Sequence, residues 1–181
     1  MDINIILPYK ETYSENLAGA VSLLVSEVKN RCKFKKNIKV FGSLILKKPL
    51  TKDYVSCDLS DKPFYYIFGK TSYYLKNIKK KISKKSIIEI HNRPQAANFF
   101  INNNNNNKII LYFHNDPLTL RGSKYVYQRI FLLKNLEKLI FVSEWTKRQF
   151  FKDLPVLDSE KCLVIYPGCN SIKKVIKKKI I

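Results

Sequence analysis

Short apolar runs of strand length recur along the chain, and each ends abruptly in polar residues, proline or glycine. The clearest run is Lys108 to Pro117, KIILYFHNDP, whose apolar character stops at His114-Asn115-Asp116. A short, nearly continuous apolar run is typical of a strand in a parallel sheet that is covered on both faces. Residues 87–94, IIEIHNRP, are a weaker copy of this shape. Two neighbouring strands that both end in His-Asn would place two imidazoles beside one crevice.

Similar runs, with amphipathic stretches between them, predict alternating strands and helices along the whole chain. Further strands are predicted at residues 3–7, 38–41, 54–57, 139–142 and 163–165. Helices are predicted from Leu17, Val21, Leu24 and Val28 after an N-cap at Ser14, at 63–82, near 95–100, from Val126, Ile130 and Leu133 after an N-cap at Ser123, and at 145–151 after an N-cap at Ser143. The alternation predicts an α/β fold with a doubly wound, mostly parallel, Rossmann-like sheet.

Residues 63–82, PFYYIFGKTSYYLKNIKKKI, combine apolar side chains at helical spacing with many lysines. Such a helix could lie on a membrane or contact a lipid-linked substrate. The interpretation that we favour is an ordinary amphipathic helix that packs its apolar face on the sheet and leaves its lysines in solvent.

The length of 181 residues and the composition are compatible with one globular domain. The net charge of +20 bears on which partners the chain could bind. A basic excess favours polyanions such as nucleic acid, phosphorylated ligands or an anionic membrane face. Part of the basic excess has a non-functional explanation, because AT-rich coding enriches Lys, Asn and Ile together. The sequence contains neither a bilayer-length apolar run nor a signal-peptide pattern. We therefore expect a cytoplasmic protein, with peripheral contact at the inner membrane face as an option.

The cysteines give no sign of a metal site. Cys32, Cys57, Cys162 and Cys169 form no CxxC pair and have no histidine at metal-ligand spacing. We expect reduced thiols without a metal or redox role.

The polar residues at the two strand ends suit sugar or phosphate recognition. An imidazole that titrates near neutrality, as expected for His114, exchanges protons with hydroxyl and phosphate groups. Asn115 and Asp116 add hydrogen-bonding groups, and Arg121 can hold a phosphate or carboxylate in a forked contact. The second strand end repeats the set with His91, Asn92 and Arg93.

A purely structural interpretation stands beside this one. A histidine at a strand end often only bonds a backbone carbonyl, and Asn-Asp-Pro is a plain turn signal. Two such ends in one sheet, each with an arginine nearby, favour a site. The sequence has no P-loop, HExxH or Ser-His-Asp order that would indicate another standard enzyme class.

The segment after the first strand contains Ala18-Gly19-Ala20, which we expect in the first turns of the following helix. Helix N-terminal amides favour phosphate, and a glycine allows close approach of a ligand. The segment is not a GxGxxG motif, and a lone glycine is more often a packing residue.

Taken in order, LPYKETYSENLAGAV, IIEIHNRPQ, LYFHNDP, LRGSK, IFVSEWTKRQF and VIYPGCN resemble the amino-terminal domain of family-4-type glycosyltransferases of the GT-B fold. The likeness is to bacterial enzymes of cell-surface polysaccharide assembly and covers roughly Asn4 to Asn170. It implies that the chain is one half of a GT-B architecture.

The resemblance also implies roles for single residues. His114 and Asp116 would be catalytic, with His114 near the transferred sugar. Ala18 and Gly19 would form the donor diphosphate loop, although the family has a second glycine where this chain has Ala18. The residues expected to bind acceptor or sugar are Glu15, Asn16, His91, Asn92, Arg93, Asn115, Arg121 and Glu144. Neither a metal nor a cofactor is implied, because the nucleotide sugar is the donor substrate.

In the family, a hinge leads from this domain to a second domain that binds the nucleotide sugar. We expect residues 1–170 to form the acceptor-side domain and residues 171–181 to begin the hinge and second domain, so that the chain is truncated. Catalysis needs donor and acceptor in one closed cleft, so we expect inactivity unless a donor-domain chain complements this one.

The predicted function is transfer of a hexose from a nucleotide sugar to a glycan or lipid-linked acceptor. The family implies retention of anomeric configuration; Asp116 or Glu15 could serve as a base in an inverting enzyme. One alternative is a non-enzymatic basic module that binds an anionic membrane or nucleic acid, although no specific nucleic-acid motif is present. A nucleotide-binding enzyme of another α/β type is a third option, disfavoured by the missing phosphate fingerprint.

Overall fold

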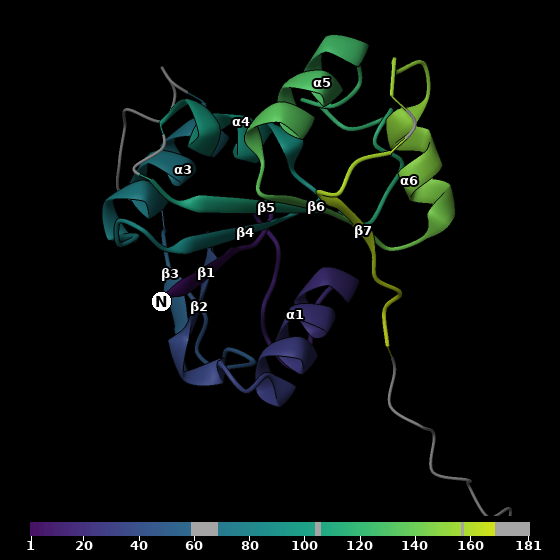
Figure 1. Ribbon diagram of the computed structural model, residues 1–181. Helices are drawn as coiled ribbons and strands as arrows, with labels where there is room; N and C mark the ends of the chain where they lie inside the picture. The colour runs from purple at the N-terminus through teal and green to yellow at the C-terminus, as the bar shows by residue number, and fades with distance from the viewer. Residues whose placement is uncertain (59–68, 104–105, 157, 169–181) are drawn as a thin grey trace, which may run out of the picture.

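A parallel sheet forms the centre of the molecule (Figure 1). The computed structural model describes residues 1–58, 69–103, 106–156 and 158–168. Within these residues the strands are β1 (Ile3–Ile6), β2 (Ile38–Gly42), β3 (Tyr54–Ser56), β4 (Ile87–His91), β5 (Lys108–Phe113), β6 (Lys138–Phe141) and β7 (Cys162–Val164). Their spatial order is β3-β2-β1-β4-β5-β6-β7, and all neighbouring pairs are parallel. The predicted doubly wound, Rossmann-like α/β fold is confirmed, with the switch of strand order between β1 and β4.

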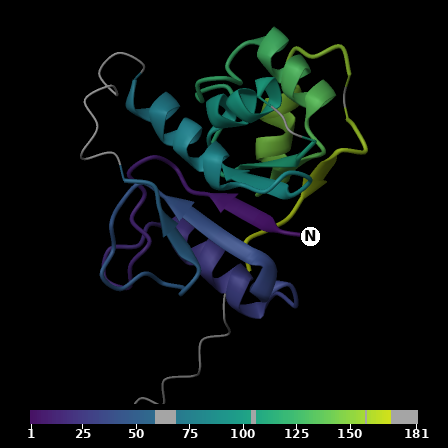
Figure 2. The same cartoon turned by 90° about the vertical axis from the view of Figure 1, so that its left-hand side faces the viewer.

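Helices cover the two faces of the sheet unequally. The described helices are α1 (Ala20–Arg31), the short 3-10 helix η1 (Lys35–Asn37), α3 (Lys70–Lys81), α4 (Pro94–Asn102), α5 (Val126–Asn135) and α6 (Glu144–Phe151). Helix α1 lies on one face, whereas α3, α4, α5 and α6 lie on the other (Figures 1 and 2). The face on the side of α1 therefore has less helical cover at β5, β6 and β7.

Alternation along the central strands explains both hydrophobic cores. Ile88 and Ile90 of β4 pack with Leu111 and Phe113 of β5 in the larger core, which also contains residues of α3, α4, α5 and α6. Ile5 and Leu7 pack with Val25 of α1 in the smaller core. Burial of these aliphatic and aromatic side chains stabilises the sheet by roughly 1.5–3 kcal/mol per large side chain.

Helix α3 confirms the interpretation of an ordinary amphipathic helix. Tyr74, Leu75 and Ile78 are buried in the larger core, so the apolar face packs on the sheet. The helix begins at Lys70 after Gly69, whose φ is +76°. The predicted helical residues 63–68 lie outside the described residues.

The sequence prediction for α1 is wrong in both the residue at which the helix starts and the face that it buries. The helix begins at Ala20 with Gly19 as N-cap, whereas Ser14 lies in the preceding loop in an isolated bridge with Pro49. Leu17 precedes the helix and is 75% exposed. The β1–α1 loop is longer than the apolar spacing predicted, because it pairs with the segment before β3 and buries Tyr13 before the helix starts.

The buried stripe of α1 is polar where an aliphatic stripe was predicted. Ser22, Val25, Ser26 and Lys29 are the buried residues, whereas Val28 is 52% exposed. The polar members are tolerated because Ser22 and Lys29 have hydrogen-bond partners across the packing interface.

The predicted cap at Ser123 is also wrong, whereas the cap at Ser143 is confirmed. Helix α5 begins after Tyr125, and the buried Ser123 hydroxyl donates to the Pro117 carbonyl at 2.6 Å. Ser123 therefore closes the loop before α5. The Ser143 hydroxyl accepts from the Thr146 amide at 3.1 Å and caps α6.

The described helices and cysteines bear on two expectations from the sequence. Among the helices that the structure describes, none combines the length and apolar character needed to cross a bilayer. Cys32, Cys57 and Cys162 are free thiols, and the last two are buried. Cys169 lies outside the described residues.

A buried lysine ties α1 to the sheet edge and gives a stability prediction. The Lys29 ammonium donates to the Ile38 carbonyl at 2.9 Å and pairs with Asp53. Lys29→Met leaves that buried carbonyl unpaired, so we expect a loss of about 1–2 kcal/mol in unfolding free energy. Urea denaturation measures this loss. The control Arg31→Met, at an exposed position of the same helix, should change stability by less than about 0.5 kcal/mol; equal losses would contradict the structural role of Lys29.

Candidate functional site

The two strand-end histidines lie in direct contact. His91 ends β4 and His114 follows β5, and the distance from His91 Nδ1 to His114 Nε2 is 2.9 Å. On the other side of the His91 ring, Nε2 lies 2.8 Å from Oε1 of Glu89. The expectation of two imidazoles beside one another is confirmed, and the structure adds a carboxylate. Glu89, His91 and His114 form a continuous hydrogen-bonded row, which we call the relay.

When both imidazoles are neutral, the relay defines the tautomer of each. A carboxylate only accepts hydrogen bonds, so His91 carries its proton on Nε2 and donates it to Glu89. His91 Nδ1 is then an acceptor, and His114 must donate from Nε2. The remaining nitrogen of His114, Nδ1, carries a lone pair. The row thus presents a hydrogen-bond acceptor of defined orientation, suited to a hydroxyl donor.

The electrostatics of His114 differ from the sequence expectation. Burial, and secondarily the neighbouring His91, lowers the pKa of His114 to about 4. The expectation that this imidazole titrates near neutrality is therefore wrong. At pH 7 His114 is neutral, so it acts as a hydrogen-bonding group and only as a weak base.

Tyr112 of β5 completes the arrangement and was not identified from the sequence. Its ring stacks on His91 with centroids 4.7 Å apart and an interplanar angle of 15°. Burial, and secondarily the charge of Glu89, raises the pKa of the Tyr112 phenol, which stays protonated. The flat ring holds the His91 imidazole in the plane that the relay requires.

The relay borders a cavity of about 350 Å³ on the α1 face of the sheet. Glu89, His91 and Tyr112 line it on one side, the segment 166–168 after β7 also lines it, and aliphatic side chains supply the rest. The apolar members are Leu24, Val25, Val28, Val142 and Ile165. Leu24 and Val28, predicted to face the core of the sheet, thus line a cavity.

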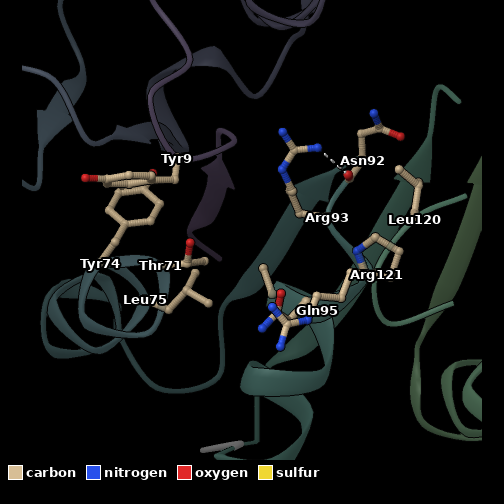
Figure 3. A pocket seen from close by; sticks show the side chains of 11 residues that line it. Tyr9, Thr71, Tyr74, Leu75, Asn92, Arg93, Gln95, Leu120 and Arg121 are labelled. Atoms are coloured by element: carbon tan, nitrogen blue, oxygen red, sulfur yellow. Dashed lines mark hydrogen bonds between the residues drawn. The ribbon is translucent and has the colours of Figure 1, made fainter. Parts of the chain in front are cut away.

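A second cavity, of about 240 Å³, lies at the switch point on the other side of the β4 end. Figure 3 shows Arg93 and Arg121 on one side of it and Tyr9 and Tyr74 on the opposite side. The structure therefore brings the two predicted arginines to one cavity. Tyr9 comes from the loop after β1 and has no motif that could have identified it.

Asn92 joins the two strand ends. Its backbone has φ +54°, its amide donates to the Tyr112 carbonyl at 2.8 Å, and its side-chain oxygen accepts from the Asn115 amide at 3.3 Å. This left-handed turn lets His91 line one cavity while Asn92 and Arg93 line the other. Asparagine tolerates this backbone conformation better than most residues.

Asp116 lies in the loop after His114, where it stabilises the turn. Its side-chain oxygen accepts from the Leu118 amide at 2.9 Å, and its carbonyl accepts from the Thr119 hydroxyl at 2.8 Å. These contacts fit the turn interpretation of Asn-Asp-Pro. A catalytic role for Asp116 stays a prediction.

The amino terminus of α1 is occupied by a protein carboxylate. Glu11 packs against the Gly19 backbone where a Cβ would clash, and its Oε1 accepts from the Ser22 hydroxyl at 3.1 Å. Gly19 makes room for Glu11, as expected of a packing glycine. Binding of a donor diphosphate at Ala18 and Gly19 stays a prediction, and it would require Glu11 to move.

The other predicted residues lie apart from the relay. Glu15 and Asn16 are exposed in the β1–α1 loop. Glu144 begins α6 and lines a further cavity with Lys147 and Arg148. Within the described part of the chain, no group of three or more His, Cys, Asp and Glu side chains could hold a metal ion.

Comparison with known proteins relates the fold of the chain to solved structures. No protein-family model matches the chain, and no curated protein matches it. A structure of Anabaena HepE in complex with UDP-glucose superposes with a TM-score of 0.59 at 11% identity, over 93% of this chain and 44% of that one. The complex of HepE with UDP and glucose superposes with a TM-score of 0.59 at 12% identity, over 94% of this chain and 45% of that one. The chain thus shares a Rossmann-like α/β fold with these structures and spans less than half of their length.

The lowered pKa of His114 gives a pH prediction. Its folded-state pKa of about 4 lies below the ordinary 6.5, so the native state binds fewer protons than the unfolded chain. The associated stability is complete above pH 6.5 and is lost as pH falls through 4; we expect about 2–3 kcal/mol. Urea unfolding at pH 7 and pH 4 should show this dependence in the wild type and much less of it in His114→Gln. An unchanged pH dependence in the variant would contradict the assignment.

The relay also predicts observable tautomers. The chain has only two histidines, so long-range 1H–15N spectra can be assigned by a single His114→Gln variant. We expect each ring to carry its proton on Nε2 in the neutral form. Glu89→Ala removes the acceptor that orients His91 and should mix the tautomers of both rings, whereas Glu137→Ala, on an exposed carboxylate, should leave the spectra unchanged.

Proposed function

We propose that the chain is the acceptor-side domain of a family-4-type glycosyltransferase of the GT-B fold. It transfers a hexose from a nucleotide sugar to a glycan or lipid-linked acceptor of bacterial surface polysaccharide assembly. The observation that carries the proposal is the relay, which presents a neutral, oriented imidazole at the carboxyl edge of a Rossmann-like sheet. The likeness in fold to structures that hold UDP-glucose, or UDP and glucose, supports it.

In this proposal His114 contacts a hydroxyl of the transferred sugar through Nδ1. A neutral imidazole of low pKa favours a hydrogen bond to the sugar over proton abstraction. His91 and Glu89 are positioning residues, because they act through His114. Asp116 shapes the loop that carries His114, and its catalytic role remains part of the proposal.

The proposal includes a second domain for turnover. The chain aligns with 44% and 45% of the two HepE structures, and hexose transfer requires donor and acceptor to be held together. The described residues would hold the acceptor, and a nucleotide-sugar-binding domain would hold the donor.

Sugar binding tests the proposed role of His114. We expect glucose and galactose, titrated to millimolar concentration, to shift the His114 resonances of the 15N-labelled chain. His114→Ala removes one buried hydrogen bond, so it should weaken the better hexose ligand about tenfold, as measured by backbone amide shifts. Arg148→Gln, which changes a charge over α6, should leave the affinity unchanged.

Two outcomes would contradict the proposal. Hexose shifts that avoid both histidines and both neighbouring cavities would place any sugar site elsewhere. Transfer of radiolabelled glucose from UDP-glucose by the purified chain alone would contradict the need for a second domain.

A further inference from the structure

The cavity at the switch point is lined by two cationic side chains. Arg93 and Arg121 both line it, and none of the described residues that line it is acidic. Both side chains are exposed, and Arg93 donates from Nη1 to the Asn92 carbonyl at 2.9 Å, which orients its guanidinium (Figure 3). Two cations that line one small cavity without an acidic neighbour favour an anionic ligand.

The chain positions Arg121 through an adjacent glycine. Gly122 has φ +98°, and a Cβ there would lie 2.7 Å from the Gln95 amide nitrogen and 3.0 Å from the Pro94 carbonyl carbon. Only glycine allows the loop to pack this closely on the start of α4. The close approach sets the loop that carries Arg121 against the start of α4, which Arg93 immediately precedes, so that both arginines line the cavity.

A buried arginine holds the same loop from the inside. Arg129 of α5 donates from Nη1 to the carbonyls of Ser123 and Lys124, at 3.3 and 2.9 Å. Its guanidinium is engaged by the protein, in contrast to that of Arg121, which lines the cavity. The loop that carries Arg121 is thereby pre-organised, which lowers the entropy cost of binding a ligand.

The opposite wall is aromatic. The Tyr74 hydroxyl donates to the carbonyls of Leu7 and Phe41, at 3.1 and 3.2 Å, which fixes its ring. The half-buried Tyr9 ring packs against it with centroids 5.7 Å apart. A fixed aromatic wall facing two arginines suits a ligand with a flat, weakly polar face and a charged end.

We propose that this cavity binds a sugar phosphate, with the phosphoryl group between Arg93 and Arg121 and the sugar ring against Tyr9. This proposal rests on the proposed function and specifies the class of acceptor. The acceptor would be a sugar that carries a phosphoryl group near the hydroxyl that reacts. Guanidinium groups match phosphate oxygens in forked contacts. A volume of about 240 Å³ is below the roughly 300–1,000 Å³ of most ligand pockets, which suits one monosaccharide unit.

Isothermal titration of the purified chain tests the assignment with four probes: glucose 1-phosphate, glucuronic acid, glucose and UDP. We expect glucose 1-phosphate to bind at least tenfold more tightly than glucose, with an affinity that falls as salt rises. Arg93→Gln and Arg121→Gln should each weaken its binding at least fivefold. Arg148→Gln is the matched control for net charge and should bind like the wild type.

Each other outcome is decisive. Equal affinity for glucose and glucose 1-phosphate, or an equal loss in Arg148→Gln, would overturn the site. Tighter binding of glucuronic acid would replace the phosphoryl group with a carboxylate and overturn the assignment. Arginine-dependent binding of UDP with greater affinity than glucose 1-phosphate would make the cavity part of a donor site.

A further variant checks the placement of the loop. Gly122→Ala should reduce glucose 1-phosphate binding while both arginines remain, and circular dichroism will show whether the fold is retained.

The proposed sugar role of His114 and the proposed anion site can fail separately. Arginine-dependent binding of glucose 1-phosphate that leaves His114 unperturbed by hexoses would uphold the anion site and refute the sugar role of His114.

Discussion

The register between β4 and β5 is the constraint on which the candidate site depends. His91 lies opposite Tyr112, and Ile90 lies opposite Leu111. Because side chains alternate between the faces of a strand, Glu89, His91 and Tyr112 share the α1 face while their neighbours fill the larger core. A shift of one residue would bury the carboxylate and imidazole in that core and expose isoleucines. Burial of the aliphatic face therefore also assembles the relay.

The end of β4 separates two chemically different cavities. On the α1 side, Glu89 and His91 line one cavity, and burial with the adjacent imidazole keeps the neighbouring His114 neutral. On the other side, Arg93 and Arg121 offer charge beside an aromatic wall. The left-handed turn at Asn92 connects the two surfaces within three residues. A transferred sugar at His114 and an anionic acceptor at the two arginines would match this division.

Several elements were predictable because local chemistry determines them. The strands of the sheet follow from apolar runs that suit burial on both faces, and Ser143 caps α6 through its own hydroxyl. The caps at Ser14 and Ser123 were mispredicted because both residues make other contacts in the loops before the helices. Ser14 bridges to Pro49, and Ser123 donates to the Pro117 carbonyl. A hydroxyl near a helix start has several partners in reach, and the tertiary packing selects one of them.

By itself, the sequence determined the alternation of elements, the fold class, and the positions of His91 and His114 at neighbouring strand ends. These features depend on hydrophobic periodicity and strand order, which are legible along one chain. Only the tertiary structure decided that Glu89 orients His91, that His114 titrates near 4, and that Glu11 fills the start of α1. Those properties arise from desolvation, from a side-chain contact within β4 and from contacts between residues on different segments. All three depend on the packed environment of a side chain, which residue type and spacing alone do not determine.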